Sequence, residues 1–263
     1  MWTRKELKEK GKKAFMLNYW KTVLVSLILA ILIGGAAGSV AGVGGRSGAS
    51  HKNDPAIEST TEQSGSVTDA VDEFADKATD FDIPAGAVAA LVVLVAIIVV
   101  IVSGISIAIN AFVLNPIEIG CQRFFTRNLN QKANIGEITY AFDHNYLNNV
   151  KTTFLRDLYT VLWTMLFIIP GIIKSYEYRM IPYILADHPE MTTKEVFAKS
   201  KELTQGQKWK AFVLDLSFIG WEILSLFTAR ILGLLFVSPY RNMTNAALYE
   251  RLEYGNLVVE ENN

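Results

Sequence analysis

The chain is poor in the residues that most often carry chemistry or covalent cross-links. It has one cysteine, Cys121, so an intramolecular disulfide is excluded. Its three histidines are far apart and have no spacing typical of metal ligands. The motifs Gly-x-Ser-x-Gly and His-Glu-x-x-His do not occur. These absences argue against a metal centre and a nucleophile–base pair, and we expect no enzyme, no catalytic residue and no cofactor.

Charge is also scarce. Charged residues make up 19% of the chain and hydrophobic residues 51%, whereas a soluble domain usually has about 25% charged residues. The 35 residues between Asp82 and Glu118 include no charged side chain. A helix needs roughly 20 apolar residues to cross a bilayer. The sequence therefore predicts an integral membrane protein.

Further apolar segments predict an all-α fold: one membrane domain over residues 1–263, with about six spanning helices in a bundle. Two prolines interrupt these segments, and we expect a break at Pro170 and a kink at Pro239. A cleaved signal peptide ending near 39–41 is an alternative for the first segment. The predicted spans cover 22–45, 84–114, 158–173, 175–186, 210–227 and 229–249.

Residues 1–21 hold seven Lys or Arg and two Glu. Thr3 followed by Glu6 matches a capping box, which predicts the start of a helix. Together with a partial apolar face, this favours an interfacial amphipathic helix on the cytoplasmic surface, where its basic residues attract anionic lipid. The basic flank of a spanning helix explains these charges, so we expect no nucleic-acid partner.

Residues 46–83 differ in character, with nine Asp or Glu against three Lys or Arg. Such a composition cannot bury a core, so we expect an acidic extracellular loop that is partly disordered. Apolar residues at helical spacing over 67–81 predict one short amphipathic helix. This helix rests on the outer interface or docks an extracellular partner.

Lys and Arg placement sets the expected orientation. With a cytoplasmic N-terminus, the inner segments 1–21, 116–156, 188–210 and 241–263 hold 19 Lys and Arg, and the outer segments hold five. The opposite orientation places those 19 outside. We therefore expect a multi-pass plasma-membrane protein with both termini in the cytoplasm.

A weak internal similarity suggests a repeated architecture. The segment 112–116 (FVLNP) resembles 235–239 (LFVSP), and each ends in a proline near the inner end of a predicted span. Broken helices mark binding sites in many transporters. Kinks without any transport role explain the same pattern.

Ionisable residues inside spans are candidates for function. Glu177 and Arg179 are two residues apart and point to different sides of a helix, whereas Asp215 and Glu222 share one face. We expect Arg179 to pair with Asp215, either to fix helix register or to line a proton or ion path. The full candidate set is Glu118, Glu177, Arg179, Asp215, Glu222, Arg230 and Arg241.

A strip of small residues lies in the first predicted span. Gly34, Gly38 and Gly42 repeat at a spacing of four, which allows another helix to approach closely. The strip serves packing within the chain or contact between copies in a homo-oligomer.

The C-terminal half resembles a family of bacterial polytopic membrane proteins, mostly from Gram-positive organisms, that is catalogued as a domain of unknown function. The residues that carry the resemblance are the segments 169–174 (IPGIIK), 183–187 (YILAD), 200–201 (SK), 218–221 (FIGW) and 239–240 (PY), with Tyr176, Tyr178, Gly206 and Tyr249. The resemblance implies a multi-span membrane protein and no particular activity.

The leading functional hypothesis follows from the missing motifs, the interfacial helices and the acidic loop. We expect a non-enzymatic accessory or envelope-maintenance factor that acts through contacts with membrane lipids or a protein partner. The alternative is a small-solute or lipid carrier that uses kinked helices and intramembrane charges.

Overall fold

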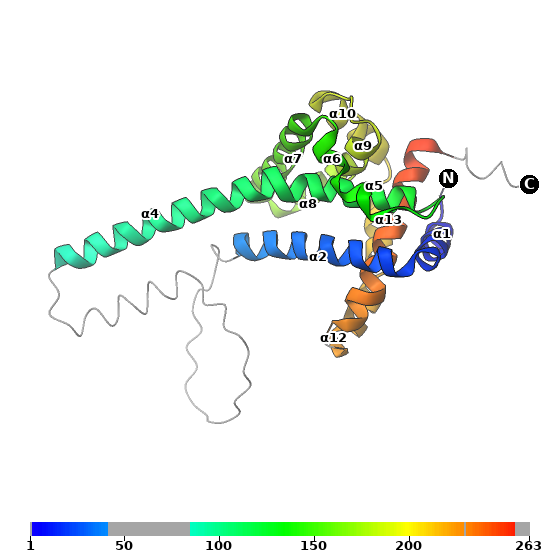
Figure 1. The fold of residues 1–263 in the computed structure, drawn as a ribbon, viewed down its shortest axis with the longest axis horizontal. Coiled ribbons are helices and arrows are strands. Elements are labelled where there is room, and N and C mark those ends of the chain that lie inside the picture. The colour runs from blue at the N-terminus through cyan, green and yellow to red at the C-terminus, as the bar shows by residue number, and fades with distance from the viewer. Residues whose placement is uncertain (1, 42–84, 229, 256–263) are drawn as a thin grey trace, which may run out of the picture. The chain divides into compact units, whose positions relative to one another are not determined.

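The computed structural model describes residues 2–41, 85–228 and 230–255 (Figure 1). Most of these residues are helical and none of them forms a β-strand, which confirms the predicted all-α class. Two compact units are distinguished, Met1–Leu32 with Asn110–Asn263 and, separately, Ile33–Ile109. The expected acidic loop 46–83, with its short helix, lies outside the described residues.

The α-helices are named as in Figure 1, and η marks π- or 3₁₀-helical turns. In chain order they are α1 (Arg4–Leu17), α2 (Tyr19–Ala41), α4 (Ala85–Ile109), η1 (Asn110–Leu114), α5 (Asn115–Arg127), η2 (Ile135–Thr139), α6 (Tyr140–Asp143), α7 (Tyr146–Leu166), α8 (Ile168–Tyr178), α9 (Ile181–Asp187), α10 (Thr193–Thr204), α11 (Lys208–Leu216), α12 (Ile219–Phe227), η3 (Gly233–Val237) and α13 (Ser238–Tyr254).

Helix α1 begins where the sequence predicts. Thr3 is its N-cap, and the Thr3 hydroxyl accepts a hydrogen bond of 3.3 Å from the backbone N–H of Glu6. The chain bends by 108° between α1 and α2. The side-chain amide of Asn18, at the bend, donates to Asn128 Oδ1 at 2.9 Å and to the Ala133 carbonyl at 3.1 Å. These two bonds tie the bend to the end of α5.

The apolar face of α1 is used inside the protein. Leu7, Ala14 and Phe15 are buried, and α1 packs against α13. A Cβ at Gly11 would lie 2.8 Å from the backbone N of Thr244, so only glycine permits this approach. Helix α13 therefore covers these residues of the predicted interfacial helix, and the contact of α1 with a membrane stays a prediction.

The core of the larger unit forms around α5, α9 and α13. Six of the seven residues of α9 are buried. Within this apolar core Asn128 is a polar junction that is 2% exposed. Its amide donates to the Ala14 carbonyl and to the Thr22 hydroxyl, each at 3.2 Å. A buried amide with these bonds is satisfied, and it holds α1, α2 and α5 in register.

Two π-helical turns correspond to the two similar segments of the sequence. η1 and η3 are each followed directly by a helix whose second residue is proline, Pro116 in α5 and Pro239 in α13. Proline has no N–H, so the carbonyl four residues earlier loses its helical donor. These carbonyls belong to Phe112 and Leu235. In both cases a single π turn lies directly before the helix that contains the proline, at the place where this hydrogen bond is missing.

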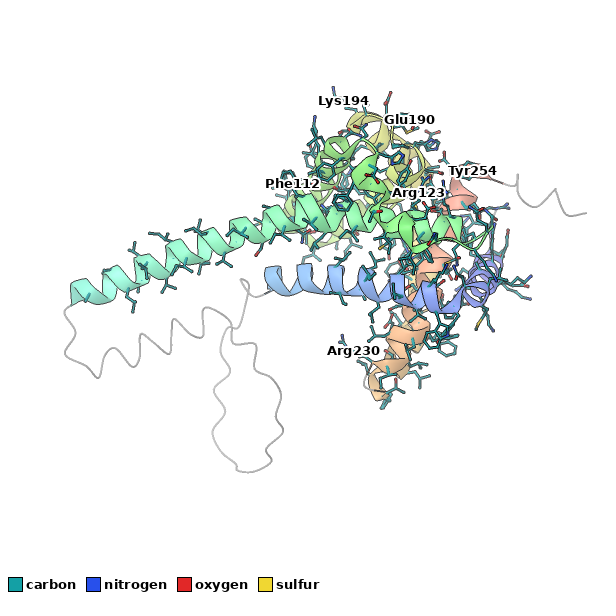
Figure 2. All side chains as sticks on the ribbon, viewed as in Figure 1. Phe112, Arg123, Glu190, Lys194, Arg230 and Tyr254 are labelled. Carbon is teal, nitrogen blue, oxygen red and sulfur yellow. The ribbon has the colours of Figure 1, made fainter. Side chains whose placement is uncertain are left out.

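A tyrosine hydroxyl donates a hydrogen bond to each of these two carbonyls. Tyr146 donates to the carbonyl of Phe112, the middle residue of η1, at 2.7 Å; Phe112 is labelled in Figure 2. Tyr19 donates to the Leu235 carbonyl at 3.2 Å. The predicted repeat thus has a physical counterpart, consisting of a π turn, a proline and a tyrosine donor.

Helices α7 and α8 form an antiparallel hairpin. Phe167, with φ −155° and ψ 135°, is extended and ends α7. Beyond it a Cβ at Gly171 would lie 2.5 Å from Thr164 Oγ1, and Lys174 Nζ lies 5.6 Å from the Trp163 ring centroid. Residues of α7 therefore contact residues of α8 in the reverse order of the chain, as in an antiparallel helix pair.

This hairpin corrects two of the expected spans. The segment 158–173 is not one helix, because Pro170 would clash with the carbonyl of Leu166 if α7 continued through it. Pro170 instead occupies the first turn of α8, where proline is tolerated, and the break falls at Phe167. The expected span 175–186 consists of the end of α8 and the buried α9.

A second hairpin joins α12 to η3 and α13. A Cβ at Gly233 would lie 3.2 Å from the Ser225 side chain, and the rings of Trp221 and Phe236 are 6.0 Å apart. Arg230 has a φ of 62° and lies at the turn (Figure 2). The expected spans 210–227 and 229–249 correspond to α11 with α12 and to η3 with α13.

One helical run among the described residues, Ala89–Arg127, is long and apolar enough to cross a membrane. A second crossing is added if α1 and α2 are counted as one bent pair. The other expected spans do not form uninterrupted apolar helices of that length.

We predict that Tyr146→Phe and Tyr19→Phe each lower the free energy of unfolding by about 0.5–1 kcal/mol, because each leaves a carbonyl without its donor. Denaturant unfolding in mild detergent measures the change. Tyr159→Phe is the matched control, since no hydrogen bond joins the Tyr159 hydroxyl to a described residue. Equal losses in all three variants would contradict the assignment.

Candidate functional site

The expected ion pair between Arg179 and Asp215 is present and joins α8 to α11. Arg179 Nη1 donates to Asp215 Oδ2 at 2.7 Å, and Nη2 donates to Oδ1 at 3.1 Å. This is the bidentate geometry in which an arginine–carboxylate pair is strongest. Both side chains are mostly buried. This pair of residues, 36 apart in the chain, thereby fixes the register of α8 against α11.

Three further residues complete what we name the Arg179–Asp215 cluster. The Tyr176 hydroxyl donates to Asp215 Oδ2 at 2.9 Å. Arg179 Nη2 also donates to Asn245 Oδ1, on α13, at 2.7 Å. Arg241, also on α13, lies 3.5 Å from Asp215 Oδ1. The cluster therefore connects α8, α11 and α13.

Glu222 lies at the edge of this cluster. Its carboxylate is 3.7 Å from Arg241 Nη1, so Arg241 bridges Asp215 and Glu222. The two acidic residues were predicted on one face of a single span, whereas they lie in different helices, α11 and α12, with Arg241 between them. Two arginines and two carboxylates balance in charge.

Glu177 has separate partners, as expected from its spacing to Arg179. Its buried carboxylate accepts from Lys174 Nζ at 2.9 Å and from Lys208 Nζ at 2.6 Å. Its carbonyl accepts from the Ser200 hydroxyl at 2.6 Å. Glu177 therefore ties α8 to α10 and to α11.

Glu118, another predicted candidate, pairs with a residue that the sequence analysis did not single out. Arg156 on α7 donates to both Glu118 carboxylate oxygens, at 3.1 and 2.9 Å. Arg156 also donates to Asp157, which accepts from Asn115 at 2.9 Å. No local signal marks Arg156, because its partner lies 38 residues earlier.

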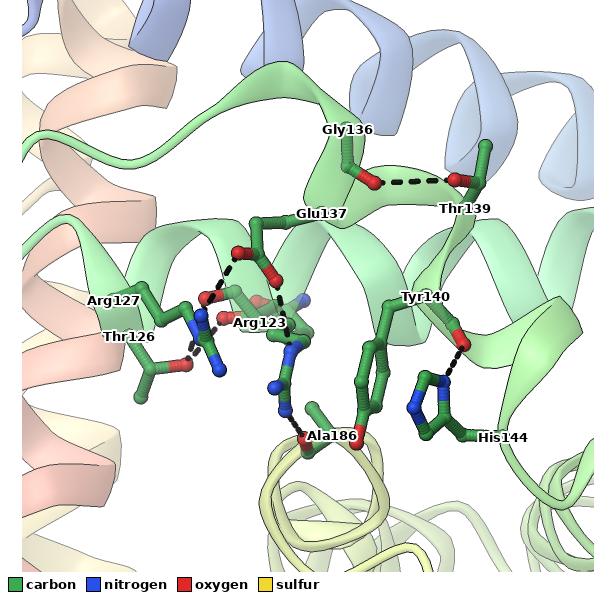
Figure 3. Close-up of polar contacts among 10 residues, drawn as sticks. Arg123, Thr126, Arg127, Gly136, Glu137, Thr139, Tyr140, His144 and Ala186 are labelled. Carbon is green, nitrogen blue, oxygen red and sulfur yellow. Dashed lines mark hydrogen bonds and ion pairs between the residues drawn. The ribbon is translucent and has the colours of Figure 1, made fainter.

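A further arginine network was also missed (Figure 3). Arg123 Nε donates to Glu137 Oε2 at 2.8 Å, and Arg127 donates to the other oxygen at 3.0 Å. Arg123 also donates to the Ala186 carbonyl at the end of α9 and lies 3.4 Å from the Tyr140 ring centroid. One guanidinium thus joins α5, η2, α6 and α9 through ion-pair, hydrogen-bond and cation–π contacts.

These arrangements favour a structural role for the charged residues. Each carboxylate in the four networks already has a cationic partner. Cys121, the one cysteine, is buried. Across the described ranges, no group of three or more His, Cys, Asp or Glu side chains is placed to hold a metal ion.

The remaining predicted residues lie apart from these networks. Gly34 and Gly38 are in α2, and Gly42 lies outside the described residues. Arg230 is exposed at the turn after α12, with no ion pair to a described residue.

We predict that Asp215→Ala and Arg179→Ala each lower the free energy of unfolding by about 2–3 kcal/mol, since each leaves a mostly buried charge without its partner. The double variant should lose less than the sum of the two. Thermal unfolding in detergent measures all three, with exposed Lys132→Ala as the control. Unchanged expression and unfolding in both single variants would contradict the pairing.

Comparison with known proteins gives one match, to part of the chain. No curated protein and no solved structure matches it. Residues 164–256, about a third of the chain, match the model of a family described as "Protein of unknown function (DUF975)". The match covers α8 to α13, including both halves of the Arg179–Asp215 pair. The predicted resemblance to a family of unknown function is thereby confirmed, and residues 164–256 are similar to DUF975.

Proposed function

We propose that the chain is a membrane-embedded protein that acts through contacts with lipids or a protein partner and catalyses no reaction. The observation that carries this proposal is the exposure of apolar side chains at the ends of the two hairpins. Monomeric soluble proteins rarely expose apolar patches of this kind, and such patches mark contacts with a membrane or with another protein.

The tip of the α7–α8 hairpin is the clearest case. Exposed apolar residues continue through the break and into α8, and Ile169 is 73% exposed. The first charged residue after the break is Lys174. The exposed apolar residues of the tip are Val161, Leu162, Trp163, Met165, Leu166, Phe167, Ile168, Ile169, Ile172 and Ile173.

The hairpin of α12 and η3 has the same character. Phe227, next to its turn, is 83% exposed, and Leu226 and Ile231 flank it with exposed side chains. Trp221 lies nearer the base of the hairpin, among the aromatic contacts with Phe236.

The lengths of the apolar segments suggest how each enters a bilayer. The 25 residues of α4 extend about 37 Å at 1.5 Å per residue, enough to cross a hydrocarbon core of about 30 Å. The nine residues of α12 extend only about 14 Å, and the apolar start of α8 less. In this proposal α2 and α4 cross, whereas the hairpins enter one leaflet, in place of six full crossings.

The contact between α1 and α13 supports this topology. Both helices belong to the larger unit and are in contact, so in this proposal they share one side of the membrane. The chain between α1 and α5 must then cross an even number of times, which two crossings by α2 and α4 satisfy. The excess of Lys and Arg in residues 1–21 and 116–156 favours the cytoplasm for that side. The acidic segment 46–83 then faces outward.

A carrier of small solutes or lipids is the second candidate. The observation that favours it is the Arg179–Asp215 cluster, a group of paired charges at the base of the α12 hairpin. Charges of this kind line the pathways of many transporters.

We predict that Ile169→Asp withdraws the tip of the α7–α8 hairpin from the bilayer, whereas Leu147→Asp leaves the tip in place. Both residues lie in the hairpin of α7 and α8 and both are 73% exposed, but Leu147 is at the polar end of α7. In water the two changes are equivalent. In a bilayer a carboxylate at the tip costs about 2.5–3.5 kcal/mol at full depth. The depth of a nitroxide on Phe167→Cys, compared between the two variants of the full chain in vesicles, measures the difference.

Equal behaviour of these two variants, or release of the unaltered chain by alkaline extraction, would contradict membrane embedding through the hairpin.

Purification from the native membrane in mild detergent separates the accessory role from the carrier role. A stoichiometric protein partner, identified by mass spectrometry, supports the accessory role. Solute or lipid flux in liposomes by the chain alone, lost in Asp215→Ala, supports the carrier and overturns the accessory role.

A further inference from the structure

A cavity of about 370 Å³ lies between the start of α1 and the start of α11. Lys8 helps to hold these elements together, because its Nζ donates to the Ser217 carbonyl at 3.3 Å and lies 4.3 Å from the Phe218 ring centroid. The cavity is lined by Trp2, Thr3, Arg4, Trp209, Lys210 and Val213.

Two cations line this cavity without a neutralising partner. Neither Arg4 nor Lys210 forms an ion pair with a carboxylate of the described residues, whereas the nearby acidic residues are engaged. Glu6 lies 3.8 Å from Arg251, and Asp215 is bound by Arg179. The residues that line the cavity therefore carry two positive charges and no negative charge. Partial burial and, second, the charge of Arg4 lower the pKa of Lys8 from its usual value.

Two indole rings supply the apolar part of the lining. Trp2 is 8% exposed, and its Nε1–H has no hydrogen-bond acceptor among the described residues. Trp209 is 72% exposed, and it stacks on Phe212 with the ring centroids 5.3 Å apart. Exposed tryptophan beside basic residues is typical of the boundary between lipid headgroups and acyl chains.

We propose that this cavity binds the phosphate headgroup of one anionic phospholipid, between Arg4 and Lys210. The proposal rests on membrane embedding and adds a headgroup preference to it. Phosphate suits two cations that line one cavity and form no ion pair with a described carboxylate, and Lys210 Nζ lies 6.0 Å from the Trp2 ring centroid. The exposed face of Trp209 then contacts the glycerol and upper acyl region, which a soluble phosphate does not offer. A free phosphate uses the cations alone and gains nothing from the indoles.

Native mass spectrometry of the full chain in a mild non-ionic detergent tests the site. The probes are phosphatidylglycerol, phosphatidylcholine and inorganic phosphate. We expect one phosphatidylglycerol molecule to bind saturably and more tightly than phosphatidylcholine. In Arg4→Gln/Lys210→Gln its apparent affinity should fall about 30-fold, at about 1 kcal/mol for each of the two basic residues.

The control variant Lys12→Gln/Lys13→Gln removes the same charge from exposed positions of α1 that do not line the cavity. It should keep the affinity within about twofold. A second variant, Val213→Phe, narrows the cavity without changing charge and should also weaken binding. Equal losses in the cavity and control variants, or no saturable lipid, would overturn the site. Inorganic phosphate binding as tightly as phosphatidylglycerol would overturn the lipid as its occupant.

Vesicle flotation distinguishes failure of the headgroup site from failure of membrane embedding, on which the proposed function depends. The cavity variant leaves α4 and both hairpins unaltered, so it should still float with neutral vesicles. If the unaltered chain fails to float, membrane embedding fails. If it floats without headgroup preference, only the cavity assignment fails.

Discussion

The packing of α1 against α13 is the constraint on which the rest of the structure depends. Gly11 lets the two helices approach within a distance that no larger side chain permits. The bonds of Asn128 then fix the bend that follows α1. This contact joins the first and last described helices of the larger unit, and the apolar α4 lies between them in the chain.

The second constraint is the chemistry of proline. Pro116 and Pro239 each follow a π turn, and each leaves one backbone carbonyl without its helical N–H donor. A tyrosine hydroxyl donates a hydrogen bond to each of these carbonyls instead. Pro170 stops α7 and turns the chain back as a hairpin. Near the bases of the hairpins, paired charges hold the helices together. The ion pairs therefore connect the helices near the bases of the hairpins, and the exposed apolar residues lie at the ends of the same hairpins.

Much of this arrangement could be predicted from the sequence, and the rest could not, for specific reasons. Charge-free runs predict apolar helices, and Arg179 with Asp215 follows from the need to pair ionisable groups in apolar surroundings. Hydropathy does not report the direction of the chain after Phe167, so a hairpin was predicted as two spans. The apolar face of α1 suits a membrane and α13 equally well. The partner of Glu118 is 38 residues distant, beyond any local pattern.

The depth of the α7–α8 tip is the most direct test of the account. Cys121 is buried, so a nitroxide attached to Phe167→Cys reports one position. Collision with oxygen and with a polar nickel complex measures its depth in vesicles, with Ile98→Cys in α4 and Leu147→Cys as references. The account predicts a Phe167 label within one leaflet, shallower than Ile98 and deeper than Leu147. A label exposed to water, or one at the opposite headgroups, would contradict it.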